Sequence, residues 1–151
     1  MIFKNLSNKT LVSIILIAFI FILDRISKIY VIYLSEGNSN SEIFSSKFLN
    51  ISLIWNQGIA FGFFSFDQKN LYNYLTLIIF GVILLVFIMM IKSVGVKRYA
   101  MLMIFAGAIG NLYDRIFYSA VPDFIDFHVG EFHWFIFNVS DIFITLGVIF
   151  M

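Results

Sequence analysis

Four stretches of the chain are apolar over lengths that suit a membrane-spanning helix. A bilayer crossing takes about 20 mostly apolar residues, and these runs are too long and too uniformly apolar for barrel strands. The pattern predicts an all-α membrane protein with four transmembrane helices, forming one domain over residues 1–151. The predicted spans cover residues 11–33, 71–91, 99–117 and 134–151.

The segments that flank the predicted spans carry two further signals. The first span follows two lysines, as in a secretory signal peptide, but no small-residue cleavage site comes after it, so we expect a retained helix. The first loop, residues 34–70, is punctuated by Asn, Ser and Gly, and residues 47–55 alternate partly between apolar and polar positions. This loop is therefore predicted to form a small β element on the outer surface of the membrane.

Basic residues gather on one side of the predicted spans. They precede the first helix and occupy the short second loop: Lys4, Lys9, Lys92, Lys97 and Arg98. The third loop, residues 118–133, has no Lys or Arg. Because basic residues favour the cytoplasmic side, we expect both termini in the cytoplasm and the first and third loops outside.

The composition excludes several classes of protein. Hydrophobic residues make up 61% of the 151 residues and charged residues only 13%, which argues against a disordered chain. The 10 basic and 9 acidic residues nearly balance, so no nucleic-acid partner is expected. The chain has no cysteine, which rules out a disulfide scaffold, a thiolate zinc site and a cysteine nucleophile.

Acidic residues converge on one layer of the predicted membrane region. At about 1.5 Å rise per residue, Asp24, Asp114 and Asp141 all fall in the outer half of their spans. Asp123 follows shortly after the third span. An ionisable side chain in a span costs roughly 2.5–3.5 kcal/mol on insertion scales, so these residues are candidates for function.

Two of these acids have basic neighbours in the sequence. Asp24 and Lys28 are four residues apart, so they share a helix face, and Asn111, Asp114 and Arg115 form a polar stripe on the third span. We interpret Asp24–Lys28 and Asp114–Arg115 as structural ion pairs, because charges within a membrane commonly pair with each other.

Asp123 and Asp141 have no basic residue within helical reach in the sequence. If the fold brings them together, the two carboxyl groups would share a proton, and one would act as a general base on water while the other acts as an acid. Asn138 lies three residues before Asp141, on the same predicted helix face. The alternative, a solvated loop acid and a helix cap, stays open at this point.

The third loop also holds His128, Glu131 and His133. Their spacing matches neither the H-E-x-x-H nor the H-x-x-E-H zinc pattern, and a polar loop explains them without a ligand. We therefore expect no metal site and no cofactor.

Five ordered segments of the chain resemble the signal peptidase II family of bacterial membrane proteases. They are DRISK at 24–28, WNQGIAFGFFS at 55–65, GAIGNLYDRI at 107–116, VPDFIDF at 121–127 and FNVSD at 137–141. The sequence departs from the usual family pattern at four positions. Arg25 stands where Gln is common, Pro122 where Val is usual, Phe135 where Pro is common and Ser140 where Ala is usual. None of these departures removes a catalytic group that the resemblance implies.

The resemblance implies a function and a set of site residues. Asp123 and Asp141 would be the catalytic dyad of an aspartic endopeptidase in the bacterial cytoplasmic (inner) membrane. This enzyme would remove the signal peptide from diacylglyceryl-modified prolipoproteins by cleaving before the lipid-modified Cys. It would act as a monomer in contact with membrane lipids and without a metal. The lining and supporting residues would be Asn56, Gly58, Asn111, Arg115, Asn138, Asp24, Lys28 and Asp114.

Two other classes of protein compete with a protease. A proton- or ion-coupled carrier would use acidic residues spread through the membrane depth and commonly has inverted repeats, neither of which the sequence shows. A noncatalytic membrane scaffold would leave the polar stripes without a purpose.

Overall fold

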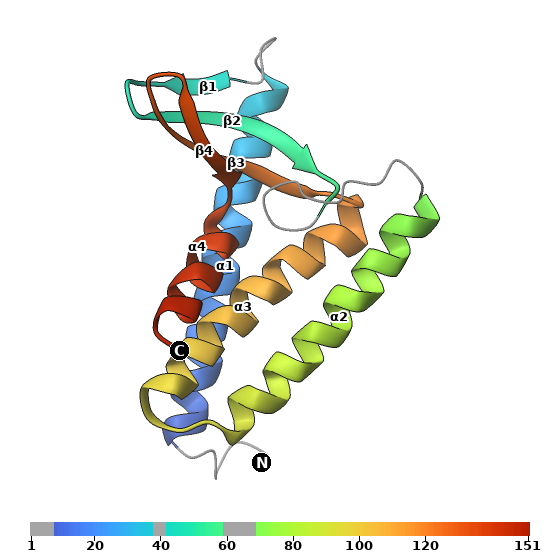
Figure 1. Cartoon of the computed structure of the whole chain (residues 1–151), viewed down its shortest axis with the longest axis vertical. Helices are drawn as coiled ribbons and strands as arrows, with labels where there is room; N and C mark the ends of the chain where they lie inside the picture. Colours follow the sequence, from blue (N-terminus) through green and yellow to red (C-terminus); the bar gives the residue numbers. More distant parts are fainter. Residues whose placement is uncertain (1–7, 38–41, 59–68) are drawn as a thin grey trace.

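The computed structural model describes residues 8–37, 42–58 and 69–151. Lys4 and the part of the second family-like segment at residues 59–65 lie outside these ranges. Within them the chain is mostly helical, with a small antiparallel sheet at one end of the helices (Figure 1).

The helices are α1 (Asn8–Glu36), α2 (Lys69–Lys92), α3 (Gly95–Tyr118) and α4 (Val139–Ile149). In the described part of the chain, α1, α2 and α3 are long and apolar enough to cross a membrane, and they cover the first three predicted stretches. Their outward faces are apolar, as a lipid-facing surface requires.

The fourth predicted span begins later than the sequence suggested. Residues 134–137 belong to a strand, and α4 has only 11 residues. The boundary at residue 134 was wrong because a short apolar run does not distinguish a strand from a buried helix segment. With 11 residues, α4 is shorter than the helix of about 20 residues that crosses a bilayer.

The sheet has the order β1-β2-β3-β4 and is antiparallel throughout. Strands β1 (Glu42–Ser45) and β2 (Leu49–Asn56) confirm the β element expected in the first loop. Strands β3 (Val121–Val129) and β4 (Phe132–Phe137) form a hairpin in the third loop that the sequence analysis missed.

Helix α3 lies between the other helices and packs against α1, α2 and α4 (Figure 1). Its contact with α4 is close because a glycine faces the neighbouring backbone. A Cβ added at Gly107 would lie 2.5 Å from the carbonyl oxygen of Ser140 and 2.9 Å from Cγ1 of Ile144. This approach fixes the start of α4 against the polar part of α3.

We expect Gly107→Ala to destabilise the protein by about 1–3 kcal/mol, because the added methyl group overpacks the α3–α4 contact. Gly81→Ala on α2 is the matched control, since a Cβ at Gly81 meets no atom within 4 Å. Thermal unfolding of the two variants in the same detergent measures the difference. Equal midpoints would show that the close approach is not required.

Candidate active site

A cavity of about 480 Å³ lies between α2, α3, α4 and the strands β2 and β3. Its wall is largely apolar, with Ile79 and Val82 from α2 and Ile144 and Val148 from α4. Five residues predicted as site residues from the sequence also line it: Asn56, Asn111, Arg115, Asp123 and Asp141. The fold thus brings together side chains that are up to 85 positions apart in the sequence (141 − 56).

Asp123 is held in the cavity wall by two side-chain amides. It lies on β3 and is 4% exposed. Asn56 donates a hydrogen bond to its Oδ2 at 2.8 Å, and Asn138 donates to its Oδ1 at 2.6 Å. Burial, with a further contribution from the negative charge of Asp141, raises the pKa of Asp123 to about 6, against the opposing effect of these hydrogen bonds.

Asp141 lies in the first turn of α4 and closes a capping box with Asn138. The Asp141 backbone N–H donates to Oδ1 of Asn138, and the Asn138 backbone N–H donates to Oδ2 of Asp141, both at 3.2 Å. Asn111 on α3 donates to the other carboxylate oxygen at 2.8 Å. Asp141 therefore does have the helix-capping role that was the alternative to catalysis, and the same residue also lines the cavity.

The side chain of Asn138 connects Asp123 to the backbone of Asp141. Its side-chain NH₂ donates to Asp123, while its side-chain oxygen accepts from the backbone of Asp141. Asn138 is fully buried, at 0% exposure, so this amide has little freedom to move away. One side chain thus fixes the positions of both acids relative to each other.

Arg115 supplies a positive charge beside this pair. Its guanidinium donates to the carbonyl oxygens of Gly58, at 2.8 Å, and Asn111, at 3.1 Å. The ion pair predicted with Asp114 was wrong, because the Arg115 side chain points toward the cavity, where it interacts electrostatically with Asp123 and Asp141.

Asp114 belongs instead to a buried network of four charges between α1 and α3. Its carboxylate binds Arg25, with Nη2 at 2.8 Å from Oδ2, and Lys28, with Nζ at 2.7 Å from Oδ2. The predicted pair of Asp24 and Lys28 is present, at 3.0 Å, and Arg25 also binds Asp24. Two acids and two bases balance, which lowers the cost of burying them.

This network also supports the cavity. Lys28 donates to the side-chain oxygen of Asn111 at 2.9 Å, and the NH₂ of Asn111 holds Asp141. Asp24 accepts the backbone N–H of Ser140 at 3.0 Å, at the start of α4. In the sequence Arg25 stands out as a departure from the usual family pattern, and its position within an apolar span is the signal for a role in this network.

A second group of potential ligands lies outside the cavity. Among the described residues, Asp126, His128 and His133 are close enough together to hold a metal ion. None of the three lines the cavity that contains Asp123 and Asp141.

Comparison with known proteins gives consistent results at the levels of sequence and structure. A profile of the family described as Signal peptidase (SPase) II matches residues 16–151. The lipoprotein signal peptidase of Pelagibacter ubique (strain HTCC1062) is 49% identical over 95% of this chain and 86% of its own length. That of Anaplasma marginale (strain Florida) is 42% identical, over 92% of this chain and 81% of its own.

Two solved structures of bacterial membrane enzymes share the fold. One, determined by the in meso method at 2.3 Å resolution, superposes with a TM-score of 0.73 at 32% identity, covering 92% of this chain and 84% of the other. The second, at 1.9 Å, gives a TM-score of 0.72 at 28% identity over 92% and 88%. The chain belongs to the signal peptidase II family of bacterial membrane proteases, which remove the signal peptides of lipoproteins.

Proposed function

We propose that this chain is an intramembrane aspartic endopeptidase in which Asp123 and Asp141 form the catalytic pair. The observation that carries the proposal is that the buried carboxyl group of Asp123 and the half-buried carboxyl group of Asp141 line one cavity, and that Asn138 binds both residues. Its substrate is a diacylglyceryl-modified prolipoprotein, cut on the amino side of the lipid-modified Cys.

The pair acts with one proton shared between its two carboxyl groups, because close carboxylates in a buried site do not both ionise. The ionised group takes a proton from a water molecule as that water attacks the scissile carbonyl carbon, and the protonated group donates to the carbonyl oxygen. Collapse of the tetrahedral intermediate returns a proton to the leaving amine. Arg115 offsets the negative charge that remains in the cavity.

The walls of the cavity suit a substrate that is anchored in lipid. Apolar residues of α2 and α4 line it, so acyl chains attached to the Cys can remain among apolar groups while the peptide bond reaches Asp123 and Asp141. All the residues named for the chemistry come from one chain, which supports action as a monomer.

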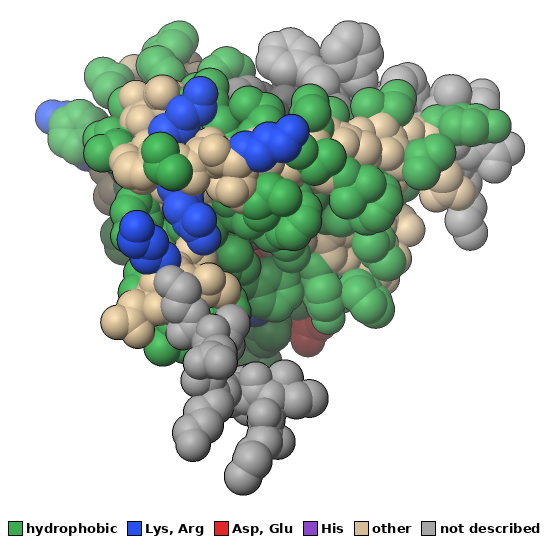
Figure 2. All heavy atoms as spheres, turned by 90° about the horizontal axis from the view of Figure 1, so that it is seen from below, with side chains coloured by type: hydrophobic (Ala, Val, Ile, Leu, Met, Phe, Trp, Pro, Cys, Tyr) green, Lys and Arg blue, Asp and Glu red, His purple; other side chains and the backbone are tan. Residues whose placement is uncertain are grey.

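We further propose that both termini face the cytoplasm and that the sheet lies on the outer surface of the membrane, with the catalytic pair near the outer leaflet. The end of the molecule opposite the sheet gathers Lys and Arg side chains (Figure 2), and Lys9, Lys92 and Lys97 are exposed there. Helix α4 runs from the sheet toward this basic end (Figure 1), in the direction of a fourth crossing.

The arrangement of acidic residues favours a peptidase over an ion-coupled carrier. Asp24, Asp114 and Asp141 are connected through Lys28 and Asn111 into one continuous cluster. A relay across the membrane would need such groups distributed through its depth.

The direct test of the proposed substrate uses purified protein and two forms of one prolipoprotein. We expect release of the signal peptide from the diacylglyceryl-modified form and no release from a variant whose Cys is replaced by Ala. Mass spectrometry of the released peptide identifies the bond that is cut. Equal cleavage of both forms would contradict recognition of the lipid-modified Cys.

The pH dependence of kcat/KM should be bell-shaped, since the pair needs one protonated and one ionised group. Burial and the charge of Asp141 raise the pKa of Asp123 to about 6, so the pair keeps its shared proton to a higher pH than a solvent-exposed Asp would. Activity should therefore extend toward neutral pH and fall when the pair loses that proton. A rate that continues to rise through neutral and alkaline pH would contradict the shared-proton pair.

Chelation should leave cleavage intact, because water is activated by carboxyl groups in this mechanism. We expect EDTA to change the initial rate by less than about twofold, and the double variant His128→Ala/His133→Ala to retain most activity. Complete loss of cleavage both in EDTA, with recovery on addition of zinc, and in the double histidine variant would refute the aspartic mechanism.

A further inference from the structure

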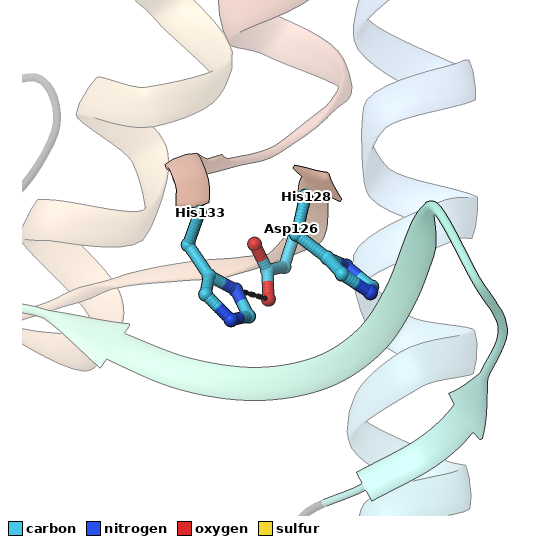
Figure 3. Close-up of side chains that lie close together, drawn as sticks. All are labelled: Asp126, His128 and His133. Atoms are coloured by element: carbon cyan, nitrogen blue, oxygen red, sulfur yellow. Dashed lines mark hydrogen bonds and ion pairs between the residues drawn. The ribbon is translucent and has the colours of Figure 1, made fainter. Parts of the chain in front are cut away.

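The β3–β4 hairpin carries a cluster of three metal-ligating side chains. Asp126 and His128 are two residues apart on β3, with a register shift between them, and His133 is the register partner of His128 on β4. Figure 3 shows the Asp126 carboxylate and the two imidazole rings gathered on one side of the hairpin. In the sequence Glu131 stood in this group, but the fold places Asp126 there instead.

The spacing of this cluster is close to that of a metal site. Ligand atoms from Asp126, His128 and His133 all lie within 4.8 Å of one another, and Nδ1 of His133 is 2.8 Å from Oδ2 of Asp126. A tetrahedral zinc ion with bonds of about 2.0–2.2 Å holds its ligand atoms roughly 3.3–3.5 Å apart. His133 has a side chain that is 51% exposed, so a small rotation of its ring can close the remaining gap.

Two buried polar atoms of the cluster have no hydrogen-bond partner within the described parts of the chain. They are Oδ1 of Asp126, a residue that is only 6% exposed, and Nδ1 of His128. Buried polar groups are normally satisfied, and a carboxylate oxygen and an imidazole nitrogen are both good ligands for zinc. The ion pair of His133 with Asp126 leaves both of these atoms unsatisfied.

We propose that Asp126, His128 and His133 bind one zinc ion on the β3–β4 hairpin, with water completing its coordination. Two nitrogen ligands and one oxygen ligand favour zinc over Mg²⁺ or Ca²⁺, which prefer sites made of oxygen ligands. The ion would connect β3 to β4. Asp123 lies on β3 three residues before Asp126, so this connection would steady the strand that carries Asp123 without taking part in the chemistry.

The sequence allows any zinc binding through imidazole to be assigned to this cluster. The chain contains two histidines and no cysteine, so imidazole ligands for zinc can come only from this cluster. The full-length protein, prepared without a polyhistidine tag and stripped with chelator, is titrated in detergent with zinc chloride by calorimetry. Cobalt(II) is used in parallel, because its visible absorption reports tetrahedral coordination by nitrogen and oxygen.

We expect one zinc ion per chain for the unmodified protein and for the matched control Glu131→Gln, which changes an exposed acid at the tip of the same hairpin. His128→Ala and His133→Ala should each weaken zinc binding at least tenfold and abolish the cobalt spectrum. Zinc should also raise the unfolding temperature of the unmodified protein and of the control, but not of the two histidine variants.

Two results would overturn the proposal. One is the absence of saturable zinc binding, which would leave the ion pair and the stacked imidazole rings as the whole role of the cluster. The other is binding that persists unchanged in both histidine variants. Cleavage of prolipoprotein by the same variants confirms that they are folded and keeps this test separate from that of the proposed function.

Discussion

Asp123→Asn and Asp141→Asn should each abolish prolipoprotein cleavage while leaving the protein folded in the membrane. In the proposed mechanism each carboxyl group serves as acid and base in turn, and an amide can do neither at ordinary pH. General acid–base catalysis contributes typically about 10²–10⁴-fold per group, so the loss in kcat should reach at least this range. The measurement is the single-turnover rate of signal-peptide release, with thermal unfolding recorded on the same preparations.

The two substitutions are expected to conserve the fold because Asn keeps the shape of the side chain and one carbonyl oxygen. At position 123 that oxygen can still accept the amide of Asn56 or Asn138. Glu131→Gln, which removes an exposed acid from the same hairpin, serves as the control and should cleave normally. Near-normal turnover by Asp123→Asn would remove Asp123 from the mechanism.

Asp114→Asn should act mainly on stability, lowering the free energy of unfolding by about 3–5 kcal/mol, the usual cost of breaking a buried ion pair from one side. Asp114 is fully buried and binds Arg25 and Lys28, so its loss leaves two positive charges with a single carboxylate, that of Asp24. Denaturation of the purified variant in detergent measures this loss.

A double-mutant cycle with Arg25→Gln separates the ion pair from other effects of the substitution. Removing both partners should cost less than the sum of the two single substitutions, because the second change eliminates a charge that the first left unpaired. Loss of activity by Asp114→Asn with an unchanged unfolding midpoint would contradict this role and place Asp114 in the chemistry.

The hydrophobic pattern predicted the long helices well. It failed where a short strand and a short helix follow each other closely. α1, α2 and α3 are long and predominantly apolar, and lipid permits such segments only as helices in a chain of this kind. The hairpin of β3 and β4 is also rich in apolar and aromatic residues, and β4 adjoins α4 without a polar break except Asn138. The spacing of hydrophobic residues alone cannot show where the strand ends and the helix begins in such a run.

The residues of the candidate site were predicted from the sequence, but several of their hydrogen-bond and ion-pair partners were not. Asp123, Asp141, Asn56 and Asn111 were identified from the sequence, and the fold places all four at one cavity. The link made by Asn138 depends on its position as the residue that caps α4, which required the correct start of that helix. The partner of Asp114 was assigned wrongly because the nearest base in sequence, Arg115, points to a different side of α3 from Asp114.

The most direct test of the central claim compares single-turnover cleavage by the unmodified protein, Asp123→Asn, Asp141→Asn and the double variant on one diacylglyceryl-modified prolipoprotein. Two groups that share one proton act as a unit, so their losses do not add. We predict that both single variants fall to the same residual rate and that the double variant is no slower than either. Near-wild-type cleavage by either single variant, or losses that multiply in the double variant, would contradict catalysis by this pair.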